Sequence, residues 1–196
     1  MDSSKRLRML VEAGLAIAIA YVLHFIVLFQ MPQGGAVKAA NLVPLIIFSL
    51  RWGGKAGILT GVAYGLIHFL LGFKFTLHIA SFFLDYLIAY GCIGVAGFFK
   101  NSRGGAVVGT IVACVLRWVS SVISGAVVFA SYAPKGMNPW IYSMGYNASY
   151  MIPDMAINVI VIALFYNTDL TVSALFLGLA AVAAAFVLGR FRVRFL

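Results

Sequence analysis

Long stretches of this sequence lack charged residues, and this feature constrains the fold more than any other. Between Ala56 and Gly72, for example, there is no Asp, Glu, Lys or Arg. Only 10% of the residues are charged and 63% are hydrophobic, whereas about a quarter of a soluble domain is charged. Such a chain cannot cover a soluble globule with polar side chains. We therefore expect one all-α integral membrane domain, because 196 residues leave no room for a separate soluble one.

Apolar windows bounded by charges, Gly or Pro predict six transmembrane helices. We expect these helices near residues 9–30, 37–50, 55–72, 77–99, 105–130 and 140–167, with Pro153 as a candidate break in the last. Another apolar stretch, 172–189, precedes a basic tail. The sequence thus predicts a six-helix domain over 1–167, followed by a hydrophobic segment over 168–196 that is either a seventh span or a tail on one side.

The distribution of Lys and Arg predicts a cytoplasmic N-terminus in a multi-pass cell-membrane protein. With that orientation the residues on the cytoplasmic side are Lys5, Arg6, Arg8, Arg51, Lys55, Lys100 and Arg103, and those outside are Lys38, Lys74 and Lys135. The basic tail stays inside with six spans and lies outside with seven. Charge therefore favours six spans, whereas hydropathy favours seven.

The sequence lacks the residue patterns that several classes of function require. The net charge of +9 is explained by these topology signals, so we expect no nucleic-acid partner. Cys92 and Cys114 have no CxxC motif or His neighbour and are interpreted as small core residues, with no metal site. The segment 53–57 lacks the leading Gly and the Ser/Thr of a P-loop, and no hydrolase or metalloprotease motif occurs. We expect neither an enzyme nor a cofactor.

Ionisable side chains inside a membrane cost at least ~2.5–3.5 kcal/mol each, which makes them candidates for function. Asp85, Asp154 and Arg117 are of this kind. His78, Phe82 and Asp85 follow i, i+4, i+7 spacing and so share one helix face, with Tyr86 beside it. The pattern predicts a ligand pocket, and the alternative is that Asp85 and Arg117 pair as an internal brace.

Two further helices would complete this pocket. The helix expected at 105–130 carries a second stripe along one face: Arg117, Ser121, Gly125 and Phe129. The helix expected at 140–167 has polar residues at its outer end: Tyr142, Ser143 and Asn147. An interfacial aromatic belt is the alternative for Tyr142. For His24 and His68, lone imidazoles on apolar helices, packing is favoured over a ligand role. On the first helix Gly14, Ala16, Ala18 and Ala20 have the four-residue spacing of a helix-contact face, for a partner helix or for internal packing.

Four separated motifs in the expected order carry a resemblance to a known family: MPQGG at 31–35, VPLIIFSLRWGGKAG at 43–57, FFLDYLIAY at 82–90 and SYAPKGMNPWIYSMGYN at 131–147. The chain resembles the thiamine-specific S-component of energy-coupling factor transporters over residues 5–167. The resemblance implies a six-helix membrane protein that captures a vitamin outside the cell. It also implies a transmembrane coupling subunit and two ATP-binding subunits as partners.

The resemblance also implies roles for residues. Asp85 and Tyr86 match the positions that bind the aminopyrimidine, and a carboxylate suits this task because it accepts hydrogen bonds from an amine. The other matched binding positions are Arg117, Tyr142, Ser143 and Asn147. The chain departs from the family where a His and a Trp are replaced by Ser121 and Phe129, and where the first loop, the expected lid, has Gln33, Gly34 and Gly35 instead of an aromatic residue. The cage for the thiazolium cation would therefore be thinner.

Three hypotheses follow from these patterns. The leading one is a binding subunit for thiamine or a close relative. The second is a stand-alone secondary transporter that couples a solute to protons through Asp85 or Asp154. The third is a structural membrane scaffold, which would give the polar helix faces no purpose.

Overall fold

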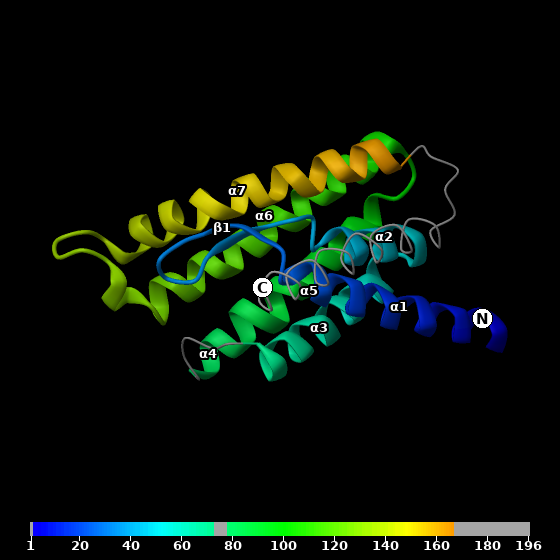
Figure 1. Cartoon of the computed structure of the whole chain (residues 1–196), viewed down its shortest axis with the longest axis horizontal. Helices are drawn as coiled ribbons and strands as arrows, with labels where there is room; N and C mark the ends of the chain where they lie inside the picture. Colours follow the sequence, from blue (N-terminus) through cyan, green and yellow to red (C-terminus); the bar gives the residue numbers. More distant parts are fainter. Residues whose placement is uncertain (1, 73–77, 167–196) are drawn as a thin grey trace, which may run out of the picture.

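The computed structural model describes residues 2–72 and 78–166, and the predicted C-terminal stretch 172–189 and its tail lie outside them. The elements in chain order are α1 Ser3–His24, β1 Val27–Gln30, β2 Ala36–Lys38, α2 Val43–Trp52, α3 Gly54–Leu71, α4 Ile79–Ser81, the π-helix η1 Phe82–Ile88, α5 Ala89–Ile93, the 3₁₀-helix η2 Gly94–Phe99, α6 Arg103–Val127, the 3₁₀ turn η3 Ala130–Tyr132 and α7 Pro139–Phe165. Figure 1 shows α6 and α7 side by side along most of their lengths.

Five helices in the described part of the chain are long and apolar enough to cross a membrane: Ser3–His24, Gly54–Leu71, Ile79–Phe99, Arg103–Val127 and Pro139–Phe165. The helix at the second predicted position, Val43–Trp52, has 10 residues. At 1.5 Å per residue it measures about 15 Å, half of the bilayer core. The expected helical class is confirmed, and the described residues hold five long apolar helices and this shorter one.

The boundary between the first two predicted helices was wrong. Residues 27–38 form an antiparallel hairpin, in which Val27 pairs with Lys38 and Gln30 with Ala36. Gly34 between the strands has φ 90°, a conformation open to Gly and costly for most other residues. Hydropathy could not separate a short apolar strand such as VLFQ from the end of a helix, since both are apolar runs.

The spanning segment Ile79–Phe99 changes helix type three times along its length, from α to π, back to α and then to 3₁₀. Its π-helical part, Phe82–Ile88, carries Asp85 and Tyr86. Short π segments inside helices are frequently found at functional sites. This part lies directly against α3, because a Cβ at Gly65 would come within 2.3 Å of the Tyr86 carbonyl oxygen. Glycine at position 65 thus lets the two backbones meet.

The last described helix runs through its proline without a break. Pro153 lies inside α7, which continues to Phe165, so the candidate break at this residue was wrong. Asn138 caps the N-terminus of α7, where its side-chain oxygen accepts a hydrogen bond from the Trp140 N–H at 2.9 Å. A single long helix therefore forms one wall of the bundle.

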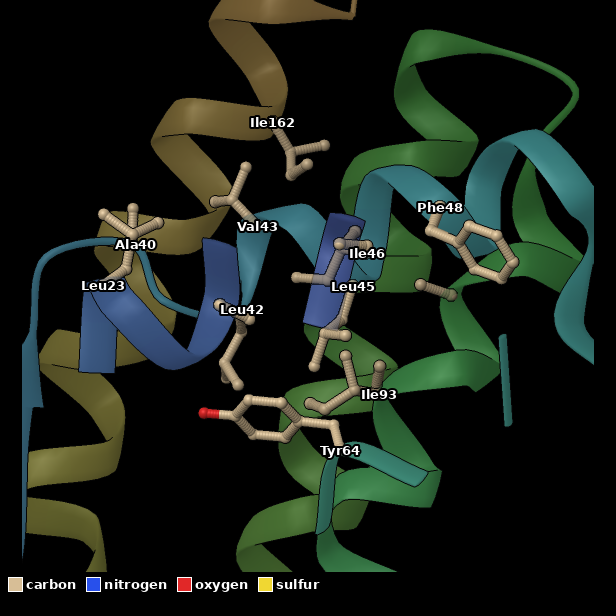
Figure 2. Close-up of a cluster of buried hydrophobic side chains, with 14 of the residues drawn as sticks. Leu23, Ala40, Leu42, Val43, Leu45, Ile46, Phe48, Tyr64, Ile93 and Ile162 are labelled. Atoms are coloured by element: carbon tan, nitrogen blue, oxygen red, sulfur yellow. The ribbon is translucent and has the colours of Figure 1, made fainter. Parts of the chain in front are cut away.

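The buried core surrounds α2. Figure 2 shows Leu42, Leu45 and Ile46 among side chains from the neighbouring helices, including Leu23, Tyr64, Ile93 and Ile162. In a membrane the lipid tails are as apolar as these side chains, so close packing rather than exclusion of water holds the helices together. Glu12 joins α1 to α2, because it accepts a hydrogen bond from Trp52 Nε1 at 2.7 Å and forms an ion pair with Arg51, whose Nε lies 3.0 Å from Glu12 Oε2.

Candidate ligand-binding site

A cavity of about 460 Å³ lies between the hairpin and helices α1, α3, η1, α5, α6 and α7. This volume is within the range of small-molecule sites. All the candidate substrate-binding residues from the sequence except His78 line it: Gln33, Gly35, Asp85, Tyr86, Arg117, Ser121, Gly125, Phe129, Tyr142, Ser143 and Asn147. His78 instead caps α4, where its Nδ1 accepts a hydrogen bond from the Ala80 N–H at 3.2 Å.

Two serine hydroxyls hold the Asp85 carboxylate. Ser81 Oγ donates to Oδ2 at 2.6 Å, and Ser124 Oγ on α6 donates to the same oxygen. The other oxygen, Oδ1, has no hydrogen-bond partner among residues 2–72 and 78–166 and is left for a ligand. Hydroxyl donors fix the direction of a carboxylate without neutralising its charge. Asp85 is thus prepared to accept hydrogen bonds from a ligand in the cavity.

Arg117 pairs with a different carboxylate from the one that the sequence suggested. Its Nη1 lies 3.6 Å from Asp154 Oδ2, and its guanidinium lies over the Tyr90 ring, 5.4 Å from the centroid. Asp154 Oδ1 also accepts a hydrogen bond from the backbone N–H of Lys38 at 3.1 Å. The internal brace is therefore Arg117 with Asp154, and it ties α6, α7 and the hairpin together, while Asp85 stands apart from it.

Ser143 and Asn147 use their polar groups where α6 and α7 meet. Ser143 Oγ donates to the Val122 carbonyl oxygen at 2.8 Å. Asn147 Nδ2 donates to the Ser143 carbonyl oxygen at 2.9 Å, and its Oδ1 accepts a hydrogen bond from the Tyr150 hydroxyl at 2.7 Å. Both residues are buried. A Cβ at Gly125 would lie 2.2 Å from Ser143 Oγ, so glycine at this position lets the two helices approach closely.

The hairpin covers the cavity and is attached to α7. The backbone N–H of Gly35 donates to the Tyr146 hydroxyl at 3.1 Å, in addition to the bond between Lys38 and Asp154. Tyr146 is one of several aromatic residues that the sequence interpretation missed; the others that line the cavity are Tyr90, Tyr132 and Tyr150. The i, i+4, i+8 spacing of Tyr142, Tyr146 and Tyr150 is a signal that could have placed the last two on one face.

Three basic side chains were also missed, and no sequence spacing could have found them. His24 on α1, Lys38 on β2 and His68 on α3 all line the cavity. Lys38 Nζ lies 2.8 Å from His24 Nδ1, and His68 Nε2 lies 3.1 Å from His24 Nε2. Lys38, expected to be a topology signal, is half-buried in the hairpin, where burial and the nearby charge of Arg117 lower the pKa of its amine to about 7.

The small residues on α1 divide between two faces. Ala16 and Ala20 are buried in the protein's own core, so they serve internal packing. Gly14 and Ala18 are exposed and remain open to a partner helix.

Comparison with known proteins identifies the family. A family model described as "Thiamine transporter protein (Thia_YuaJ)" matches residues 10–174. The chain belongs to this family. A thiamine transporter ThiT from Bacillus subtilis is 38% identical over 183 residues, covering 86% of this chain and 95% of its own. A second ThiT, from Lacticaseibacillus paracasei, is 26% identical and covers 83% of this chain and 88% of its own.

The fold of the family agrees as well. A solved structure of ThiT from Listeria monocytogenes has a TM-score of 0.76 at 24% identity, covering 84% of this chain and 96% of its own. The resemblance found in the sequence is therefore confirmed, as is the expectation of a transport protein rather than an enzyme. Together with the five long apolar helices, membership of this family makes the chain a multi-pass membrane protein.

Proposed function

We propose that the chain is the substrate-binding subunit of an energy-coupling factor importer and that it captures thiamine or a close relative outside the cell. The observation that carries the proposal is Asp85, whose carboxylate is held by two hydroxyls in a cavity of suitable size. Its carboxylate can accept hydrogen bonds from the exocyclic amine of an aminopyrimidine and from a ring nitrogen when that nitrogen is protonated. The relatives named as thiamine transporters support this choice of ligand.

The cation of the ligand would be held by aromatic faces. Phe129 stacks on Tyr132 with ring centroids 5.7 Å apart, and Tyr142 stacks on Tyr146 at 6.0 Å. Tyr146 in turn meets the edge of Tyr150 at 5.7 Å. These rings line the same cavity as Asp85. These rings, which we call the tyrosine wall, would then hold the thiazolium cation. They would replace the His and Trp that the family has at the positions of Ser121 and Phe129.

The remaining parts of the proposal concern topology and partners. Six spans over residues 1–167, with a cytoplasmic N-terminus, would place the hairpin and the start of α7 outside. The exposed positions Gly14 and Ala18 on α1 are the proposed contact for a transmembrane coupling subunit, because small residues allow helices to approach closely. Two ATP-binding subunits would supply the energy, since the sequence contains no P-loop.

Calorimetric titration of the purified protein with thiamine tests this proposal, with riboflavin and biotin as controls. We expect saturable binding of thiamine alone. Asp85→Asn should weaken it at least tenfold, because a hydrogen bond to a charged group contributes about 1.5–3 kcal/mol. Asp2→Asn, which changes an exposed carboxylate outside the cavity lining, should leave the affinity unchanged. Lack of thiamine binding would overturn the function, and unchanged affinity in Asp85→Asn would overturn the site.

A further inference from the structure

Three basic side chains gather at the end of the bundle where α3 and α6 begin. Lys55 lies in the first turn of α3, Lys100 follows η2, and Arg103 is the first residue of α6. All three are exposed, and none of them lines the ligand cavity. We name these three residues the basic patch. The proposed function gives the patch no task beyond the general preference of basic residues for one side of a membrane.

The 3₁₀-helix η2 brings Lys100 to the start of α3. Phe98 of η2 lies directly against α3, since a Cβ at Gly54 would overlap its ring. Lys100 Nζ is 3.9 Å from the point where a Cβ at Gly53 would stand, and Gly53 is the residue before α3. The amine of Lys100 therefore lies beside the helix turn that carries Lys55.

Arg103 joins the patch from the start of α6. Two residues separate it from Lys100 in the sequence. Phe99 packs on the first turns of α6, because a Cβ at Gly109 would lie 2.8 Å from the Phe99 Cβ. The backbone of Lys100 is held as well, since its carbonyl oxygen accepts a hydrogen bond from the Tyr166 hydroxyl at 2.8 Å. The ends of η2, α3 and α6 thus form one packed support for the three basic side chains.

The charge of the patch is not matched by the protein. In the part of the chain that the structure describes, no Asp or Glu oxygen lies within 4.0 Å of the three side chains, and Glu12 pairs with Arg8 and Arg51. Two aromatic rings are exposed beside the patch: Phe98 is 56% exposed and Phe99 is 36% exposed. Unmatched positive charge next to exposed rings, at the end of membrane-spanning helices, fits a molecule with an anionic head and apolar chains.

We propose that the basic patch binds the headgroup of an anionic phospholipid, with Phe98 and Phe99 in contact with its acyl chains. A phosphate diester carries the negative charge that ammonium and guanidinium groups recognise. An acidic protein segment has the charge but no acyl chain to cover the two rings, so the patch favours a lipid. With the topology proposed above, this lipid belongs to the cytoplasmic leaflet. The site is separate from the cavity, and the inference is independent of the ligand that the cavity holds.

Native mass spectrometry of the purified protein with equal amounts of phosphatidylglycerol and phosphatidylcholine tests the proposal. We expect the wild type to retain phosphatidylglycerol in preference. Lys55→Gln/Lys100→Gln should bind it about tenfold more weakly, because each basic side chain near anionic lipid contributes roughly fivefold in affinity. Lys5→Gln/Arg6→Gln removes the same charge from exposed positions of α1 and is the matched control, which should keep the preference. Lys55→Arg/Lys100→Arg should keep it too, because it keeps the charge.

The outcomes separate a defined site from general attraction. Equal retention of the two lipids by the wild type would overturn the proposal, as would an equal loss in the two Gln double variants. Unfolding temperatures without lipid check the fold of each variant, and Arg103→Gln, expected to weaken binding about fivefold, is an independent variant of the patch. Competition identifies the occupant. Displacement of phosphatidylglycerol by inorganic phosphate or by polyglutamate at equal concentration would assign the patch to a free ion or to an acidic protein segment, and the lipid would be overturned.

Discussion

At the scale of single residues, two carboxylates of the bundle, Asp154 and Asp85, have different kinds of partner. Asp154 is buried beside Arg117 and accepts a backbone N–H from the hairpin, so its charge is matched within the protein. Within residues 2–72 and 78–166, Asp85 accepts its hydrogen bonds from the hydroxyls of Ser81 and Ser124. A charge matched inside the protein stabilises the fold, whereas one that is oriented but unmatched is available to a ligand. This difference is why we assign binding to Asp85 and bracing to Asp154.

Lys38 should make thiamine binding depend on pH. With a pKa of about 7, its amine is mostly charged below pH 7 and mostly neutral above it. The charged amine repels a cationic ligand, so thiamine affinity should fall roughly tenfold as the pH is lowered from 8 to 6. The other charged or titratable groups near this amine are His24, His68, Arg117 and Asp154. They remain in Lys38→Met, and the difference between the two pH profiles therefore reports on Lys38. Parallel profiles would contradict the prediction.

At the scale of elements, the close contact between α6 and α7 shapes one wall of the cavity. Gly125 on α6 faces Ser143 on α7 with no room for a methyl group. Ser143 cannot move freely, because its hydroxyl is bonded to the Val122 carbonyl oxygen and its carbonyl oxygen to Asn147. The position of Asn147 and Tyr150 therefore depends on the glycine at 125.

Gly125→Ala should force the two helices apart. We expect a loss of about 1–3 kcal/mol in stability from overpacking, and weaker ligand binding, because the tyrosine wall shifts with α7. Gly145→Ala, at an exposed position of α7 where a Cβ meets nothing within 4 Å, should be neutral or stabilising by about 0.5–1 kcal/mol. Thermal unfolding and thiamine titration of both variants provide the measurement. Equal unfolding temperatures and equal thiamine affinities of the two variants would contradict a role for the contact between Gly125 and Ser143.

The sequence predicted the spanning helices well and the connection between the first two poorly. Long apolar runs identify a membrane helix whatever its neighbours are, and α3, α6 and α7 were found in this way. Whether VLFQ pairs as a strand depends on residues 36–38 and on α7, and hydropathy contains no such information. The same limit applies to the site. Asp85 was predicted as a site residue because a charged side chain in a membrane costs free energy. His24 and His68 come together through the packing of α1 on α3, which the sequence does not reveal.

At the scale of the whole molecule, the proposed importer and the proton-coupled alternative differ in what the isolated chain can do. A proton-coupled transporter needs a carboxylate that gains and loses a proton during transport. Asp154 is fixed by Arg117 and Lys38, and Asp85 by two serines. We therefore expect the chain to act as a binding subunit rather than as a secondary transporter.

The isolated chain should bind thiamine without transporting it. In liposomes that contain the purified protein and no ATP, an imposed pH gradient should drive no thiamine uptake above that of protein-free liposomes. Binding by the same preparation in detergent is the control for its integrity. Uptake that follows the pH gradient and is lost in Asp85→Asn would favour the proton-coupled mechanism instead.

The π-helix Phe82–Ile88 has a consequence for comparing sequences in this family. Each of its turns closes over one residue more than an α turn, so the helix faces before and after it are out of step. Counting at 3.6 residues per turn across this segment therefore assigns residues to the wrong face. A relative without the π turn would reach the same site with one residue fewer. An ungapped alignment would then match Asp85 to a neighbour of the true counterpart, and the binding carboxylate would seem to be missing from a protein that has it.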